Sequence, residues 1–117
     1  AKAAIKLNYE KSNYLIDPHT AVGVDSLSKY RTESADLRVA VVDSTASPYK
    51  FSRAVLESLS NKKIDKDEYR VVEELNELTE VEVHRAIADL ENKEIRHDKS
   101  CEKGEVKSEL EDILDLD

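Results

Sequence analysis

The sequence predicts a mainly helical α/β chain of about six helices, one core strand and one or two short edge strands. Apolar side chains recur at three- and four-residue spacing over most of the chain, which predicts the helices. The run "LRVAVV" (37–42) is short, apolar and rich in β-branched residues, which predicts the strand. At 117 residues, the chain is long enough for a single domain, 1–117, with a buried core.

Two helices are predicted before the strand. In the first, Ile5 and Tyr9 lie four residues apart, and the helix ends near Asn13. The second begins at Asp17-Pro18, because Asp is a favoured N-cap and Pro a favoured first helical residue. The apolar face of this second helix holds Ala21, Val24 and Leu27.

Four helices are predicted after the strand. One begins at Ser47-Pro48, and a polar connector (60–68) separates it from the next. Thr79 and Glu82 form a capping-box pattern for another, and the last follows Gly104. Their apolar faces are, in order, Phe51, Val55 and Leu59; Tyr69, Val72, Leu75 and Leu78; Val83, Ala86, Ile87 and Leu90; and Val106, Leu110, Ile113 and Leu114.

The predicted strand raises a question about its hydrogen-bond partners. A buried strand needs a neighbour on each edge to satisfy its N–H and C=O groups. Either these neighbours come from outside the chain, or residues 14–16 and 94–97 pair with the strand.

Charge and composition exclude several classes of function. The net charge is −8, and residues 61–117 hold 19 of the 26 acidic side chains. Such an acidic half repels phosphate backbones, so we expect no nucleic-acid partner. No apolar run approaches the ~20 residues of a membrane span, and the first residues lack the pattern of a secretory signal.

The cysteine content indicates a reducing environment. Cys101 is the single cysteine and cannot form an internal disulfide, so we expect a cytoplasmic location. The chain opens at Ala1 and contains no methionine, which fits a fragment, a processed chain or an engineered protein.

The turn "DSTASP" (43–48) is the first candidate site. A core strand that leads into a hydroxyl-rich turn and a helix N-terminus is where open α/β sheets bind ligands. Its hydroxyls have a second interpretation, in which Ser44, Thr45 and Ser47 only cap the following helix.

Three stretches, taken in order, resemble the C-terminal portion of threonine synthase of the bacterial and fungal type. They are "YLIDPHTAVG" (14–23), "VVDSTASPYKF" (41–51) and "KEIRHDKSC" (93–101). The resemblance extends over nearly the whole chain, and the first two motifs are specific.

The resemblance implies a pyridoxal 5'-phosphate enzyme of fold type II that converts O-phosphohomoserine and water into threonine and phosphate. It implies that Thr45 meets the pyridine nitrogen of the cofactor and that Ser44 belongs to the same wall of the pocket. It also implies that the Schiff-base lysine and the phosphate-binding loop lie upstream, so no catalytic residue is expected here. We therefore expect no cofactor bound to the chain alone.

The chain departs from the family pattern at two places. Asp43 stands where an apolar strand residue is expected, and a buried carboxylate there costs several kcal/mol unless it is paired. The stretch "LTEVEVHRAIADL" (78–90) carries charges where the family tends toward Gly and Pro. Both changes suit a chain whose former interfaces face water.

Other candidate residues keep two interpretations each. Lys50 faces either the phosphate of the substrate or solvent, and His19 either transfers protons or only forms structural hydrogen bonds. His84, His97 and Cys101 lack the spacing of a zinc site, so no metal is expected. Glu102 beside Cys101 opposes a reactive thiolate.

Two hypotheses for function remain at this stage. In the first, the chain is the C-terminal segment of a threonine synthase and is inert by itself. In the second, it is a free-standing or engineered soluble module, derived from that segment and not catalytic. Under either hypothesis, bare edges of the predicted strand favour self-association of the chain.

Overall fold

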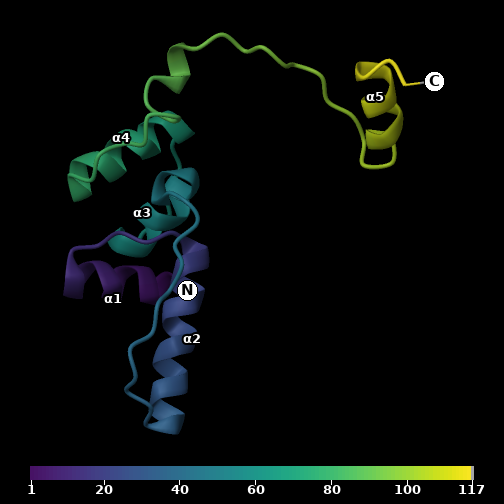
Figure 1. Ribbon diagram of the computed structural model, residues 1–117. Coiled ribbons are helices and arrows are strands. Elements are labelled where there is room, and N and C mark those ends of the chain that lie inside the picture. Colours follow the sequence, from purple (N-terminus) through teal and green to yellow (C-terminus); the bar gives the residue numbers. More distant parts are fainter. Residues whose placement is uncertain (117) are drawn as a thin grey trace.

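The computed structural model describes residues 1–116 and is helical, without a strand in that range. Within these residues, five α-helices and two short 3₁₀ helices follow one another (Figure 1). They are α1 (Lys2–Ser12), α2 (Pro18–Ser34), η1 (Pro48–Phe51), α3 (Ser52–Ser60), α4 (Glu68–Thr79), η2 (Leu90–Asn92) and α5 (Val106–Ile113). The prediction of an α/β chain with a core strand is therefore wrong.

The core lies where α3 packs against α1, α4 and η1, with α2 packed against α1. Val55 of α3 and Leu75 of α4 are fully buried, as is Ile5 of α1. The remaining core side chains are Leu15, Ile16, Ala21, Tyr49, Leu56 and Val71. Amphipathic helices thus meet around α3. On α4, however, the buried apolar residues are Val71 and Leu75, whereas Tyr69 and Leu78 of the predicted face are 40% and 52% exposed.

Several predicted helix boundaries are confirmed. Asn13 ends α1 in the left-handed conformation at φ 52°. Asp17 caps α2 with Pro18 as the first helical residue, and Ser47 caps η1 with Pro48 in the same position. Both caps place a side-chain oxygen on free backbone N–H groups, which is the physical reason why these pairs mark helix starts.

The predicted core strand (37–42) is irregular and largely exposed. Leu37, Val39 and Val41 expose 83%, 96% and 87% of their surface. A strand is stable only when a neighbour takes up its backbone hydrogen bonds, and no segment within residues 1–116 does so. The two segments expected to pair with this strand do not do so. Leu15 and Ile16 pack in the helical core, and Ile95 is 82% exposed.

Instead of joining a sheet, this segment returns along α2 (Figure 1). The Nη2 atom of Arg31 donates to the backbone oxygen of Arg38 over 2.9 Å. Further along, a Cβ atom on Gly23 would lie 3.2 Å from Cγ1 of Val42, so the missing side chain allows a close approach. The segment is therefore held by α2, although Leu37, Val39 and Val41 face outward.

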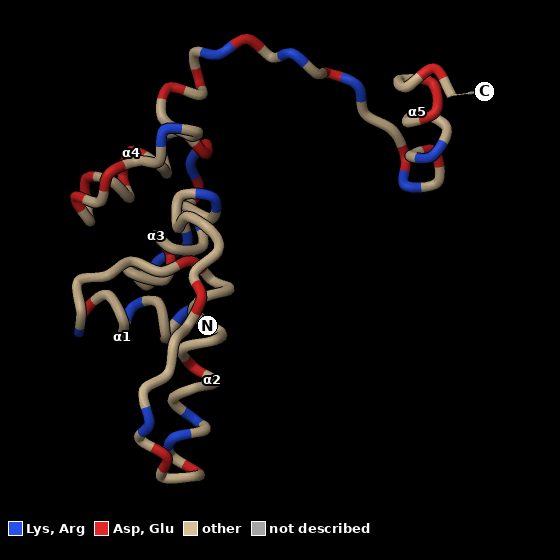
Figure 2. Tube along the Cα trace, viewed as in Figure 1, with Lys and Arg blue, Asp and Glu red and all other residues tan. Residues whose placement is uncertain are grey.

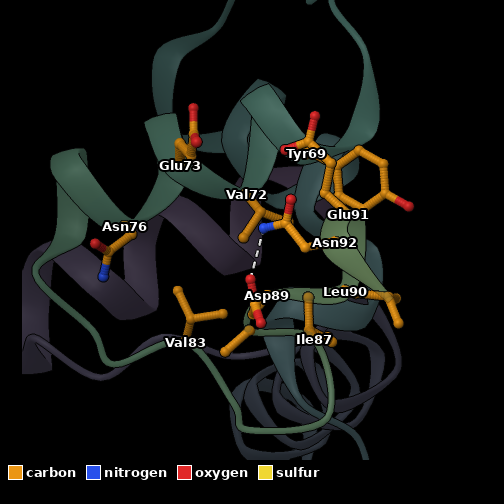
Figure 3. A pocket seen from close by; sticks show the side chains of 11 residues that line it. Tyr69, Val72, Glu73, Asn76, Val83, Ile87, Asp89, Leu90, Glu91 and Asn92 are labelled. Carbon is orange, nitrogen blue, oxygen red and sulfur yellow. Dashed lines mark hydrogen bonds between the residues drawn. The ribbon is translucent and has the colours of Figure 1, made fainter. Parts of the chain in front are cut away.

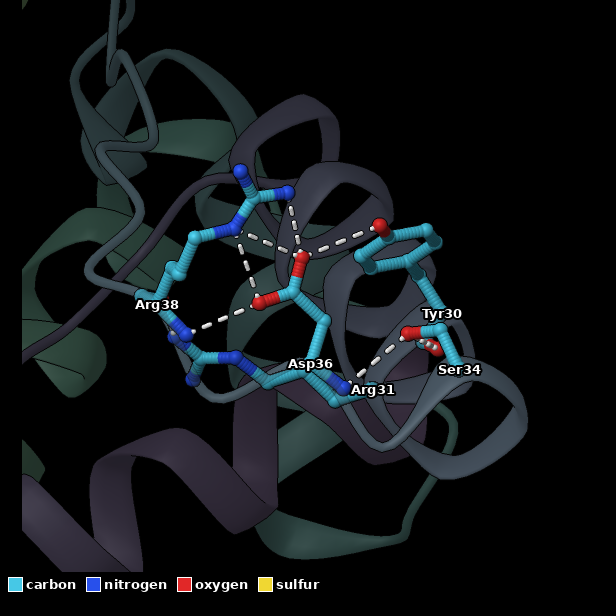
Figure 4. Close-up of polar contacts among 5 residues, drawn as sticks. All are labelled: Tyr30, Arg31, Ser34, Asp36 and Arg38. Atoms are coloured by element: carbon cyan, nitrogen blue, oxygen red, sulfur yellow. Dashed lines mark hydrogen bonds and ion pairs between the residues drawn. The ribbon is translucent and has the colours of Figure 1, made fainter.

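Asp36 makes the tight turn between α2 and this segment (Figure 4). The Nη2 atom of Arg38 donates to Asp36 Oδ2 over 2.7 Å, and the hydroxyl of Tyr30 donates to the same oxygen over 3.1 Å. These bonds, with that of Arg38 foremost, lower the pKa of Asp36 to about 2. The carboxylate thus stays charged at all but strongly acidic pH.

The helix predicted from the Thr79–Glu82 capping box is absent, and residues 81–89 form a loop that leads to η2. Thr79 is the last residue of α4, and its hydroxyl donates to the backbone oxygen of Leu75 over 2.7 Å. The backbone oxygen of Val81 accepts hydrogen bonds from the Tyr49 hydroxyl and from Asn76 Nδ2. These tertiary contacts hold the loop, so the local capping signal is overridden.

Helix α5 forms as predicted but lies at the far end of an extended segment (93–105), away from the core (Figure 1). Its apolar face is exposed, with Leu110 at 51% and Ile113 at 60%, and Leu114, which follows the helix, is 60% exposed. Acidic and basic residues alternate along the segment and the helix (Figure 2), and Lys107 pairs with Glu111 over 3.5 Å. Such surface pairs contribute little stability. In the described residues, no helix is both apolar enough and long enough to cross a membrane.

We expect the core and α5 to respond differently to truncation. Leu75→Ala should lower the free energy of unfolding by about 2–5 kcal/mol, because it opens a cavity in a fully buried site. Leu114→Ala, at an exposed site, should change it by no more than about 0.5 kcal/mol. Urea unfolding of both variants measures this, and equal losses would contradict the packing described above.

Candidate functional site

The N-terminus of α2 and the turn before η1 meet at one surface, and the buried carboxylate of Asp17 lies beneath it. Asp17 has no exposed surface. Its Oδ1 atom accepts from the backbone N–H of His19 over 2.8 Å, and its Oδ2 atom accepts from the hydroxyl of Thr20. Thr20 Oγ1 in turn lies 3.1 Å from Ser44 Oγ. Two motifs that are separate in the sequence are thus joined by hydrogen bonds.

The charge on Asp17 is stabilised despite its burial. Burial raises the pKa of Asp17, but the hydrogen bonds from Thr20 and His19 outweigh it and hold the pKa below its usual value. A carboxylate with several donors is ionised near neutral pH. Asp17 is therefore a buried negative charge that only accepts hydrogen bonds.

His19 lies at the edge of this surface. Its side chain is exposed, and Nδ1 lies 3.1 Å from Asp17 Oδ1. Because the ionised carboxylate has no proton to give, Nδ1 carries the proton of this contact. The ring packs at a tilt against Phe51, with 4.9 Å between centroids.

The structure places the predicted site residues as follows. Ser44 and Thr45 are exposed in the turn, and no hydrogen bond of the Thr45 side chain occurs among residues 1–116. Lys50 is exposed, and its Nζ atom lies 5.8 Å from the centroid of the Phe51 ring. Lys50 and Phe51 also line a mostly apolar groove of about 610 Å³ beside α4. No ion pair of Lys50 occurs within residues 1–116, so its charge remains available.

Sequence reasoning gave Asp17 only the role of a helix cap and missed its contact with the second motif through Thr20. One signal was available: Thr20 is three residues after the N-cap, where a side chain reaches back to the cap. The link from Thr20 to Ser44 spans 24 residues and depends on the path of the chain along α2. No local pattern encodes that path.

A second hollow of about 360 Å³ lies between α4 and the loop that leads to η2 (Figure 3). Asn92 Nδ2 donates to Asp89 Oδ1 over 2.6 Å within it, and Lys93 pairs with Asp89 on its rim. Asp89 and Asn92 thus partner one another, and we assign no function to this hollow. Within residues 1–116, no three His, Cys, Asp or Glu side chains gather as metal ligands would.

We expect Asp17 to stabilise the chain more than an ordinary helix cap does. Asp67 caps α4 with the same pair of backbone bonds but is exposed, so it serves as the matched control. Asp17→Asn should cost about 1–3 kcal/mol of unfolding free energy, since it removes charge-assisted hydrogen bonds at a buried site. Asp67→Asn should cost at most about 0.5 kcal/mol, because Asn caps nearly as well. Equal costs in thermal or urea unfolding would show that Asp17 acts as a cap alone.

Comparison with known proteins identifies a family for the chain. The family described as "Threonine synthase, C-terminal" matches residues 20–108. The threonine synthase of Schizosaccharomyces pombe is 44% identical over 59 residues, which cover 50% of this chain and 12% of that protein. The matching stretch is thus a small part of a much longer relative. The chain belongs to the threonine synthase C-terminal family.

Proposed function

We propose that the chain works as the C-terminal part of a threonine synthase, a lyase that converts O-phosphohomoserine and water into threonine and phosphate with pyridoxal 5'-phosphate. One observation carries the proposal: the motifs around His19-Thr20 and Ser44-Thr45 share one surface, with 3.1 Å between Thr20 Oγ1 and Ser44 Oγ. Two motifs typical of the family then serve one site. The family match supports the same function.

The side chains of the turn fit the ring-nitrogen end of this cofactor. Thr45 has an exposed hydroxyl without a partner among the described residues, so it is available to donate to a ring nitrogen. A neutral hydroxyl does not hold that nitrogen protonated as a carboxylate would, which favours elimination and replacement chemistry. When bound, the cofactor supplies the electron sink for carbanionic charge. The role of Thr45 is to orient and tune the ring.

Lys50 is the proposed contact for the phosphate of the substrate. Lys50 is exposed in η1, and the neighbouring Phe51 packs against His19 of the first motif. A positive charge at this edge of the site attracts a dianionic phosphate. The competing interpretation, a lysine that only faces solvent, predicts no effect of its removal on substrate binding.

We propose that the chain alone is inert and binds no cofactor specifically. Gly23 and Gly104 are its two glycines, so its sequence offers no glycine-rich phosphate loop. The bare apolar side chains of residues 37–41 and of α5 suit a segment that packs against the rest of an enzyme. The alternative, a free-standing or engineered module without catalysis, is less favoured because such a module would cover these side chains. The single exposed Cys101 supports a cytoplasmic location.

The proposed function can be tested in a chimera. This chain replaces the matching stretch of the S. pombe enzyme, and Thr45→Val is compared with Thr45→Ser. We expect Thr45→Val to lower kcat/KM about 10²-fold or more and to shift the absorbance band of the bound cofactor, whereas Thr45→Ser restores both. The chain alone, mixed with pyridoxal phosphate below millimolar concentration, should show no saturable Schiff base. An active chimera that is indifferent to Thr45→Val would contradict the assigned role.

We also propose that the isolated chain self-associates through residues 37–41. Leu37, Val39 and Val41 alternate along an extended segment and are each more than 80% exposed, so a second copy can cover them. An acidic chain of net charge −8 opposes this association, and Asp43 adds to the repulsion at the end of the segment.

We expect Val41→Lys to suppress this association and Asp43→Val to strengthen it. Because Val41 is exposed, lysine there should leave the unfolding free energy within about 0.5 kcal/mol of the original. Light scattering over a concentration series, at two salt concentrations, measures the mass of the particles. A strict monomer that is unchanged by Asp43→Val would show that these side chains do not drive association.

A further inference from the structure

The hydroxyl of Thr20 is the only source of a proton in its contact with Asp17. Asp17 is buried and ionised, and an ionised carboxylate accepts hydrogen bonds without donating any. Thr20 is itself 6% exposed, so water does not compete for the contact. The hydroxyl proton of Thr20 therefore points at Asp17 Oδ2.

The contact between the two hydroxyls then has one direction. A hydroxyl holds a single proton, and that of Thr20 is committed to Asp17. The proton between Thr20 Oγ1 and Ser44 Oγ, which are 3.1 Å apart, must come from Ser44. Ser44 thus donates to Thr20, and Thr20 donates to Asp17.

Ser44 and Thr45 are therefore chemically different, although both expose a hydroxyl in the same turn. Ser44 donates its hydroxyl proton to Thr20, so it can only accept a hydrogen bond from a ligand. The Thr45 hydroxyl makes no hydrogen bond within residues 1–116, so it can still donate one. We propose that Asp17 and Thr20 are positioning residues: they fix Ser44 as an acceptor and leave Thr45 as the hydroxyl that donates to the bound ligand.

The anchor of this arrangement is rigid. The backbone N–H of Thr20 also donates to Asp17 Oδ2 over 3.4 Å, and that of Ala21 donates to the backbone oxygen of Asp17 over 2.9 Å. Ala21 has no exposed surface and lies in the core. The first turn of α2 thus holds Thr20 in place, and the direction of the hydrogen bonds is set before any ligand arrives.

The turn then accepts two kinds of ligand group. An acceptor atom, such as an unprotonated aromatic nitrogen, is bound by Thr45, and a donor such as an ammonium or hydroxyl group is bound by Ser44. The identification of that acceptor as the ring nitrogen of pyridoxal phosphate rests on the proposed function. The direction of the hydrogen bonds does not.

The direction can be tested in the 117-residue chain without cofactor. The pKa of Asp17 is followed by carboxyl ¹³C resonances in the original chain, Thr20→Val, Thr20→Ser and Ser44→Ala. Thr20→Val keeps the shape but loses the hydroxyl, so we expect the pKa of Asp17 to rise. Thr20→Ser keeps the hydroxyl, so the pKa should stay low, and Ser44→Ala should also leave it low because Ser44 does not contact Asp17.

The opposite direction, with Thr20 donating to Ser44, gives the opposite results. Thr20→Val would then leave the pKa of Asp17 unchanged. Ser44→Ala would release the Thr20 proton to Asp17 and lower its pKa. Either result overturns the inference. A packing role for Thr20 is distinguished as well, because packing tolerates Val and suffers from Ser.

The link to the ligand is tested in the chimera by the absorbance band of bound pyridoxal phosphate. We expect Thr20→Val to shift this band and Thr20→Ser to restore it. If Thr45→Val shifts the band and Thr20→Val does not, the positioning role is wrong and the proposed function stands. If neither shifts it while the pKa of Asp17 behaves as expected, the proposed function fails and the direction of the hydrogen bonds stands.

Discussion

The structure around the candidate site depends on one buried charge, the carboxylate of Asp17. It begins α2 by accepting from backbone N–H groups of the first turn, and it accepts the hydroxyl proton of Thr20, whose oxygen lies beside Ser44 of the second motif. A buried carboxylate without such donors would cost several kcal/mol and would be neutralised. With them it is stable, and it orients every group that contacts it. The Asp17 carboxylate thus explains where α2 begins, how the two motifs are joined and which way the Thr20 hydroxyl points.

Exposed apolar surface is the second feature that shapes the behaviour of this chain. The helical core around α3 is closed, whereas residues 37–41 and α5 present bare apolar side chains. A helix can satisfy its backbone groups by itself, but a strand cannot, so the segment without a neighbour stays irregular.

Most helices could be predicted from the sequence because their signals are local. Asp17-Pro18 and Ser47-Pro48 place caps and first residues, and the spacing of Val55 and Leu59 predicts the helix that contains them. The prediction of a helix after Thr79 was wrong because tertiary contacts override the local capping signal there. The hydroxyl of Thr79 donates to the backbone oxygen of Leu75 in α4, so it does not cap a following helix. The hydrogen bond from the distant Tyr49 to the backbone oxygen of Val81 holds the loop instead.

The sequence by itself determined the helix starts at Pro18 and Pro48 and the resemblance to the threonine synthase family, which the family match confirms. Only the tertiary structure decided that Leu37–Val42 is no strand and that Thr20 contacts Ser44. A helix cap or an apolar helix face depends on residues within one or two turns, so the local sequence is enough to predict it. Strand pairing and the direction of a hydroxyl proton depend on groups far along the chain, so they exist only once the chain has folded.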